Sequence, residues 1–513
     1  MSDSFSTASK IEAQQAAYAA AQKLTIEPTA VINYQSRGHV ILLGNPDLIE
    51  KIGELPESLT HEAILYQGLS PAADIQIEGA LGRFKVTVNG QTVAGDLIVD
   101  GLPQPVLHMA LKPPGYITVN QETLHAAELK QELMHLVGTF EKPRYFDYNE
   151  AICAHGRSGI SGCTRCLDAC PAEAISSLVD KIKVDPYRCQ GGGICSTVCP
   201  SGAITYAYPR PRDLLAHVRT LLMTYRQVMD EAPELLFVTE LEQNRVKHLM
   251  PAALIIAVEE IASVGPEVWL SALAWGARNV RLFSLDGLPD STQSALSIQL
   301  ETAQTALSGM GFPPSAITQI SDPNELITAQ SMPAIKPSQH AVLSQKRQAF
   351  FMALDYLVAQ AEEVTPIMSL PEGAIFGEVN VDQTRCTLCM ACVSACPGNA
   401  LQDGRENPRL SFIEANCVQC DICTRTCPEN AITTAPRLLL DNALRQQAQV
   451  LHEDTPFCCI TCGKPFATTS GIATIITKLA GHSMFAEERA RNRLKMCDDC
   501  RVKDMMEDPS VDF

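Results

Sequence analysis

Short apolar runs alternate with amphipathic stretches over the first 145 residues. Three of these runs have the length and composition of buried strands: HVILLG (39–44), AILYQG (63–68) and DLIVD (96–100). Residues 1–24 and a proline-initiated stretch from Pro46 predict helices. KVTVNGQTV (85–93) contains the Asn-Gly pair typical of a two-residue hairpin turn. The pattern predicts a small α/β domain.

Four further apolar runs alternate with helical stretches between residues 212 and 364. They are LLFVTE (235–240), AALIIAV (252–258), NVRLFSL (279–285) and AITQI (316–320). Helices are expected at 212–230, at 265–277 and, as one long helix, at 339–364. This alternation is typical of a parallel sheet covered by helices. Residues 365–379, with two prolines and two glycines, are predicted to be a linker.

Charge and composition exclude several classes of function. The formal net charge is −18 and no run is rich in Lys or Arg, which argues against nucleic-acid binding. The first residues lack the basic and apolar regions of a signal peptide. No run reaches the roughly 18 apolar residues of a membrane helix, so no membrane insertion and a cytoplasmic location are expected. No G-x-G-x-x-G after a strand, P-loop or catalytic triad stands out, and no catalytic residue is predicted.

The 20 cysteines fall into three groups: seven in 153–199, eight in 386–427 and five in 458–500. Tight C-x2-C and C-x3-C-P spacings in a long chain without a signal peptide indicate thiolate metal ligands rather than disulfides. Four fragments repeat a C-P-x-x-A pattern: CPAEAI (170–175), CPSGAI (199–204), CPGNAL (396–401) and CPENAI (427–432). Each fragment ends one run of cysteines. The four runs form two pairs: the first pair ends at Cys170 and Cys199, and the second at Cys396 and Cys427.

The second pair is complete. Each run has the form C-x2-C-x2-C-x3-C-P, in which three cysteines hold one cluster and the fourth holds the cluster of the other run. The predicted ligands of cluster III are Cys386, Cys389, Cys392 and Cys427. Those of cluster IV are Cys396, Cys417, Cys420 and Cys423. Both are expected to be [4Fe-4S] clusters, as in the bacterial two-cluster ferredoxin module that this region resembles.

The first pair departs from this pattern in both runs. Ile160 takes the first position of one run, and a glycine-containing loop could return the upstream Cys153 to that corner. The predicted ligands of cluster I, a third [4Fe-4S] cluster, are then Cys153, Cys163, Cys166 and Cys199. A buried, unligated Cys153 is the alternative.

Cluster II has three predicted ligands, Cys170, Cys189 and Cys195, because Gly192 stands where the other runs have a cysteine. Three thiolates suit a [3Fe-4S] cluster or a [4Fe-4S] cluster with one open iron site. A degenerate motif without a cluster is the alternative.

Two C-x2-C pairs near the C-terminus form a metal knuckle pattern. Cys459, Cys462, Cys497 and Cys500 are predicted to hold one structural Zn²⁺, with rubredoxin-like iron as the alternative and Cys458 as a spare.

The expected fold is multidomain, of the α/β and α+β classes, with two ferredoxin-like dicluster modules, two α/β domains and a C-terminal zinc ribbon. The expected boundaries are an N-terminal α/β domain at 1–145, a first module at 146–211, a second α/β domain at 212–364, a second module at 365–438 and a helix with the zinc ribbon at 439–513.

The layout resembles a proteobacterial family of poly-ferredoxin proteins of the formate dehydrogenase-associated type, similar to heterodisulfide reductase iron-sulfur subunits. The motifs that carry it are YNEAICAHGRSGISGCTRCLDACPAEAI, CQGGGICSTVCPSGAITY, the run pair at 386–428, FCCITCGKPFATTS and MCDDCR. Residues 250–320 resemble the delta subunit of methyl-viologen-reducing hydrogenase, whose [2Fe-2S] cysteines are absent here.

This resemblance implies an electron-transfer protein around formate metabolism. The expected partner is a redox protein, a formate dehydrogenase or a flavoprotein. Two other functions fit the same motifs: a maturation factor for an iron-sulfur or molybdenum enzyme, and a subunit of a flavin-based bifurcating complex.

Overall fold

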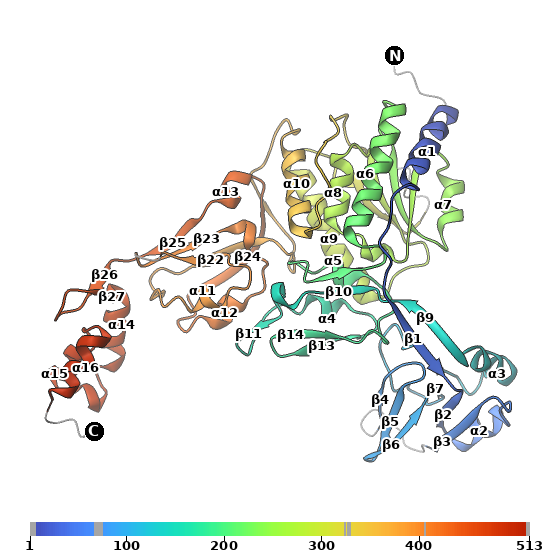
Figure 1. Cartoon of the computed structure of the whole chain (residues 1–513), viewed down its shortest axis with the longest axis horizontal. Coiled ribbons are helices and arrows are strands. Elements are labelled where there is room, and N and C mark those ends of the chain that lie inside the picture. Colours follow the sequence, from blue (N-terminus) through green and yellow to red (C-terminus); the bar gives the residue numbers. More distant parts are fainter. Residues whose placement is uncertain (1–6, 66–74, 323–324, 326–329, 405–406, 509–513) are drawn as a thin grey trace. The chain divides into compact units, whose positions relative to one another are not determined.

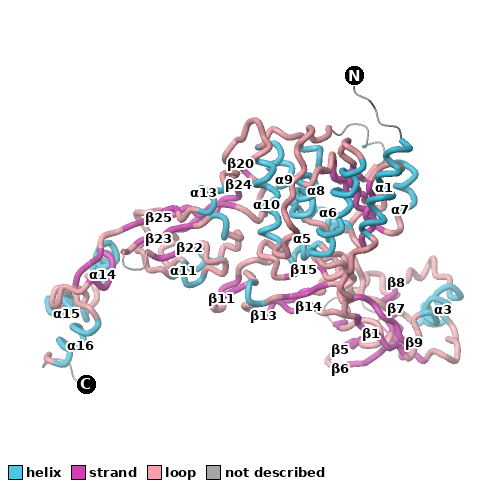
Figure 2. Tube along the Cα trace, turned by 45° about the horizontal axis from the view of Figure 1, so that its top comes forward, coloured by secondary structure: helices cyan, strands magenta, loops and turns pink. Residues whose placement is uncertain are grey.

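The computed structural model describes residues 7–65, 75–322, 325, 330–404 and 407–508 (Figure 1). Two compact units divide the chain. The first comprises 1–151, 164–178 and 182–363, and the second 152–163, 179–181 and 364–513. Mixed helices and strands in several small sheets confirm the predicted α/β multidomain class (Figure 2). Among the described residues no helix is both long and apolar enough to cross a membrane.

The N-terminal part of the first unit is built around β2 (His39–Gly44). This strand pairs in parallel with β3 (Thr60–Leu65) and β7 (Leu97–Asp100), and β8 (Tyr116–Thr118) pairs in parallel with β7. Val40 and Leu42 enter one buried cluster, while Ile41 and Leu43 enter another. Because alternate residues face opposite sides of a strand, this run of four apolar residues fills a core on each face of the sheet.

The predicted Asn-Gly hairpin is present. It joins β5 (Phe84–Val88) to β6 (Gln91–Gly95), with Asn89 at φ 49° and Gly90 at φ 80°, as a type I′ turn requires. The other elements here are α1 (Thr7–Ala21), β1 (Val31–Ser36), α2 (Pro46–Ile52), β4 (Ile75–Glu78), α3 (Ala126–His135) and β9 (Gly138–Pro143). Strand β4 pairs with β5, and β1 pairs with β9.

The second α/β region contains the predicted parallel sheet, in the order β17-β16-β18-β19. Its strands are β16 (Glu234–Thr239), β17 (Leu254–Val258), β18 (Asn279–Phe283) and β19 (Ile317–Ile320). Its helices are α6 (Pro211–Val228), α7 (Gln243–Leu249), α8 (Pro266–Ala274), α9 (Asp290–Gly309) and α10 (Lys346–Val358). Every residue of α8 is buried, so this helix lies in the core.

Two local predictions were wrong. The helix expected at 339–364 is confined to α10, because neither residues 339–345 nor residues 359–364 are helical. The expected linker at 365–379 contains β20 (Ile367–Ser369) and the start of β21 (Gly377–Val381), which both pair with β24 (Ile432–Leu439). Pairing with a strand far along the chain overrides the local signal of prolines and glycines.

The first unit also holds most of the first cysteine group. Its elements are β10 (Phe146–Tyr148), α4 (Arg165–Ala169), β13 (Ile175–Leu178), β14 (Lys181–Val184), α5 (Ile194–Thr197) and β15 (Ile204–Tyr206). Strands β10 and β15 form an antiparallel pair.

The second unit contains the other cysteine groups in small antiparallel sheets. Its strands, besides β20, β21 and β24, are β11 (Gly156–Arg157), β12 (Ile160–Ser161), β22 (Leu401–Asp403), β23 (Arg409–Phe412), β25 (Gln449–Glu453), β26 (Pro456–Cys458) and β27 (Pro465–Thr468). Its helices are α11 (Ala391–Ala395), α12 (Ile422–Thr426), α13 (Asn442–Gln446), α14 (Thr469–Leu479), α15 (Glu488–Arg493) and α16 (Asp498–Met506).

Candidate iron-sulfur and metal sites

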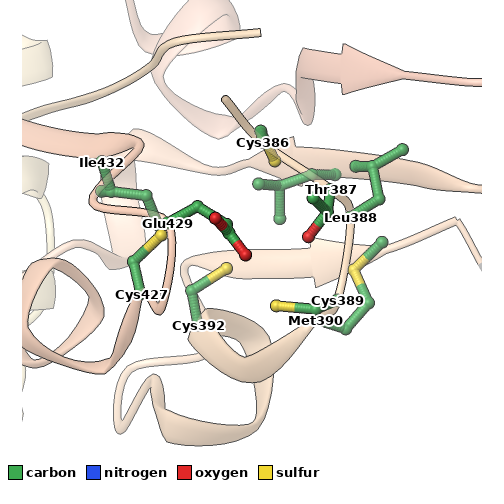
Figure 3. Close-up of a pocket in the computed structure, with 10 residues that line it drawn as sticks. Cys386, Thr387, Leu388, Cys389, Met390, Cys392, Cys427, Glu429 and Ile432 are labelled. Atoms are coloured by element: carbon green, nitrogen blue, oxygen red, sulfur yellow. The ribbon is translucent and has the colours of Figure 1, made fainter. Parts of the chain in front are cut away.

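The four cysteines predicted for cluster III line one cavity (Figure 3). Cys386 and Cys389 precede α11, Cys392 lies on it, and Cys427 follows α12. Burial, together with the charges of the three neighbouring cysteines, raises the pKa of Cys392 to about 12. Buried thiolates that repel one another need a compensating positive charge, which cluster iron supplies, so this donor set fits the group.

The four cysteines predicted for cluster IV line a second cavity. Cys417 and Cys420 precede α12, Cys423 lies on it, and Cys396 follows α11. Burial raises the pKa of Cys420 to about 12, with a smaller lowering by the backbone N–H of Ile422. Each cavity therefore takes three cysteines from one run and its fourth cysteine from the other run, which is the arrangement that the motif spacing predicts.

Both loops repeat one backbone conformation. The residues two and four places after the first cysteine have positive φ: Leu388 at 52° and Met390 at 60° in one loop, Gln419 at 49° and Asp421 at 60° in the other. Such a conformation in non-glycine residues marks a backbone held by its surroundings. It turns the loop around the space that the sulfurs line.

Several N–H groups point at cysteine sulfurs. The Ala400 N–H donates to Cys396 Sγ at 3.3 Å, and the Ala431 N–H donates to Cys427 Sγ at 3.3 Å. Gln419 Nε2 donates to Cys417 Sγ, also at 3.3 Å. Hydrogen bonds of this kind stabilise charge on the sulfurs and adjust the reduction potential of a cluster.

The three cysteines predicted for cluster II line a third cavity, together with Gly192. Gly191 at φ 83° and Gly193 at φ 70° occupy the positive-φ positions of the other two loops. A Cβ at Gly192 would meet only Pro171 Cγ within 4 Å, at 3.7 Å, which is an ordinary contact. The loop thus keeps the conformation of a cluster-binding loop, and space for a side chain remains where the cysteine is missing.

The cluster II cysteines are half-buried and belong to the first unit. Burial raises the pKa of Cys195 well above its ordinary value, and the charges of Cys189 and Cys170 add to the shift. Tyr206 donates its hydroxyl hydrogen to the carbonyl of Gly191 at 2.8 Å, and the ring of Tyr145 packs against Gly191. Two buried tyrosines therefore fix the loop that carries the glycine.

The cysteines predicted for cluster I are divided between the units. Cys153 and Cys163 belong to the second unit, whereas Cys166 and Cys199 belong to the first, so this ligand set stays a prediction. His155 is buried, and its Nδ1 lies 2.9 Å from the carbonyl oxygen of Cys163.

Within the second unit, the segment 152–163 packs against α12, which lies between the cysteines of the second pair of runs. Arg425 of α12 donates to the Ser161 carbonyl at 2.6 Å, and Gly162 lies so close to Ile422 that a Cβ would be 2.5 Å from its Cγ1. The charge of Cys163 contributes to the raised pKa of Cys420. A predicted ligand of cluster I is therefore an electrostatic neighbour of a predicted ligand of cluster IV.

The four C-terminal cysteines also converge. The sulfurs of Cys459, Cys462, Cys497 and Cys500 all lie within 4.8 Å of one another, and the pair Cys462–Cys497 is 3.6 Å apart. Tetrahedral zinc with Zn–S bonds of about 2.3 Å places sulfurs about 3.8 Å apart, so the group fits zinc. Burial acts to raise the pKa of Cys459, but backbone N–H groups lower it to about 6, which favours a thiolate. Cys458 is exposed.

Sequence reasoning did not identify Lys142 as a neighbour of the loop that carries Cys189. This residue lies in β9, 47 positions before Cys189, and donates its Nζ hydrogens to the carbonyls of Cys189 and Tyr187. Burial lowers the pKa of Lys142 to about 8, while the charges of Cys189 and Asp185 act in the opposite direction. No motif marks this lysine, because only the fold brings β9 to the cysteine loop.

Two family models match the chain. A 4Fe-4S dicluster domain matches residues 160–203, and a 4Fe-4S binding domain matches residues 379–402. A search among curated proteins finds no match to the chain. The matched segments and the cysteine cavities identify an iron-sulfur protein with ferredoxin domains, and such domains support a role in electron transfer with a redox partner.

Proposed function

We propose that the chain is a four-cluster relay that passes single electrons between a redox enzyme and an acceptor. The observation that carries this proposal is the convergence of three cysteine loops on three cavities, each lined by cysteines from two different runs. Bound clusters supply reversible one-electron chemistry; the chain supplies thiolates, N–H donors to sulfur and burial from water.

The proposed ligand sets are those of the motif spacing. Clusters I, III and IV are [4Fe-4S] clusters with four cysteines each, and cluster II is a [3Fe-4S] or open-site [4Fe-4S] cluster on Cys170, Cys189 and Cys195. The C-terminal cysteines hold Zn²⁺ and stabilise the fold of that segment.

The proposed path runs through cluster IV to cluster I. The hydrogen bond from Arg425 to the Ser161 carbonyl and the close approach of Gly162 to Ile422 support it, because both contacts lie between the Cys163 segment and the helix that follows Cys420. In the first unit, Cys166 on α4 and Cys195 on α5 lie in two helices that pack against each other, which supports a continuation from cluster I to cluster II. The resemblance to formate dehydrogenase-associated proteins supports a cytoplasmic formate dehydrogenase or flavoprotein as partner.

The relay is tested by removing one ligand of a cluster in the middle of the proposed path. Cys420→Ser removes a ligand of cluster IV, and Cys458→Ser, at the exposed spare cysteine, is the matched control. The full chain is reconstituted anaerobically, reduced with dithionite and mixed with a one-electron acceptor protein. We expect C420S to transfer electrons at least tenfold more slowly than both the unchanged chain and C458S. Equal rates in all three proteins, or a chain that no reductant reduces, would overturn the relay.

A second candidate is a maturation factor for an iron-sulfur or molybdenum enzyme. The space at Gly192 favours it, because an incomplete ligand set can release or accept iron. Deleting the chain from its native cells separates the two functions. A partner enzyme that is fully metallated but receives no electrons supports the relay, and an unmetallated partner supports maturation.

A further inference from the structure

Lys142 places a positive charge beside the loop of cluster II. Its Nζ donates to the carbonyl of Cys189 and, at 3.1 Å, to that of Tyr187, and it lies 5.0 Å from the centre of the Tyr34 ring. Its side chain is thus held on one side of the loop by two carbonyls and an aromatic face. Such a partly buried cation is screened by water less than a surface lysine is.

The three cavities differ in the charges around them. Glu429 lines the cluster III cavity, and Asp421 lines the cluster IV cavity. Glu429 pairs with Lys478, but that lysine is 60% exposed, which weakens the compensation. The described residues that line the cluster II cavity include no charged side chain.

Two other charged groups near the cluster II loop have partners of their own. The negative charge of Asp185 offsets the positive charge of Lys142. However, Asp185 Oδ1 accepts the N–H groups of Tyr187 at 2.8 Å and Arg188 at 3.3 Å, which spread its charge. Lys346 donates to the carbonyls at the end of α5 and interacts with the buried Glu267. Of these three groups, Lys142 is the one whose charged nitrogen contacts the carbonyl of Cys189.

We propose that Lys142 raises the reduction potential of cluster II, so that this cluster is where electrons collect in the chain. A cation near a cluster stabilises the added electron, whereas the carboxylates at clusters III and IV disfavour it. This inference rests on the proposed relay and gives it a direction, from clusters III and IV toward cluster II.

The test measures midpoint potentials in the full, anaerobically reconstituted chain by redox titration followed by EPR. Lys142→Gln removes the charge, Lys142→Arg keeps it, and Lys51→Gln is the control at an exposed lysine of α2. We expect cluster II to be reduced first in the unchanged chain. In K142Q we expect the equilibrium constant for reduction of cluster II to fall at least tenfold, which lowers its midpoint potential by about 59 mV for one electron. In K142R and K51Q the midpoint should stay near the unchanged value.

An unchanged cluster II midpoint in K142Q, at full iron content, would overturn the inference while leaving the relay intact. If K142Q loses cluster II iron, Asp185→Asn decides the matter. This variant removes the opposing charge and should raise the midpoint; no rise would also overturn the inference. A wild-type chain with no reducible cluster would instead overturn the relay itself.

Discussion

At the scale of single residues, Gly192 is the position that leaves the proposed cluster II with three cysteine ligands. It stands in a loop with the backbone of the two complete loops, and a Cβ there has ordinary contact with Pro171. A cysteine can therefore enter this position without steric conflict. The neighbouring Gly193 differs, because its φ is 70° and a Cβ would lie 2.4 Å from Ser263 Cβ.

We predict that Gly192→Cys adds about one iron per chain and converts a [3Fe-4S] signal in the oxidised protein to that of a four-iron cluster. Gly192→Ala is the control, because it adds the same Cβ without a ligand. Iron and sulfide analysis with EPR makes the measurement. If G192C and G192A have the same iron content and spectrum, Gly192 does not occupy a ligand position.

At the scale of elements, the carboxyl edge of the parallel sheet carries a group that titrates near neutral pH. Glu260 follows β17, and burial, then the charges of Glu259 and Glu242, raise its pKa to about 7. The folded state therefore holds the proton more tightly than the unfolded chain does. This contribution to stability is present below pH 4.5 and is lost as the pH rises through about 7.

We predict that Glu260→Gln stabilises this region by about 1–2 kcal/mol at pH 8 and changes little at pH 5, after allowance for partial exposure. Thermal unfolding is followed by tryptophan fluorescence, which reports on this region because the two tryptophans of the chain are Trp269 and Trp275. Glu240→Gln, on the same edge but exposed, is the control. A gain of stability at pH 5 equal to that at pH 8 would contradict the assignment.

The pattern of apolar and polar residues correctly predicted the strands and helices whose own apolar residues are buried in the core. The four parallel strands and the Asn-Gly hairpin are present because their apolar pattern and turn residues agree with the final fold. Residues 365–379 were predicted wrongly because their strand character depends on pairing with β24, whose residues are more than 50 positions away along the chain. The cysteine cavities could be foreseen from spacing, whereas Lys142 could not, because a lone lysine in a strand has no signature.

At the scale of the whole molecule, the C-terminal segment differs from the rest in how it is stabilised. In the described part of α14, α15 and α16, Ile472 is the buried residue. Arg493 forms partly buried ion pairs with Asp504 and Asp508, but ion pairs contribute little net folding free energy, because the attraction is offset by the loss of hydration. A segment with so small an apolar core needs another source of folding free energy, and the four converging cysteines can provide it through a bound metal.

We predict that Cys497→Ala abolishes zinc binding and unfolds residues 456–508, while clusters III and IV remain. Limited proteolysis of the full chain and zinc analysis make the measurement, with EPR to follow the clusters. Cys458→Ala is the matched control, since this exposed cysteine neighbours the site without joining it. Because the ferredoxin loops have their own core around Val379, Leu410 and Phe412, they should not depend on the metal.

A protease-resistant C497A segment would show that packing alone stabilises it. Simultaneous loss of cluster signals would show that the zinc site also supports the relay.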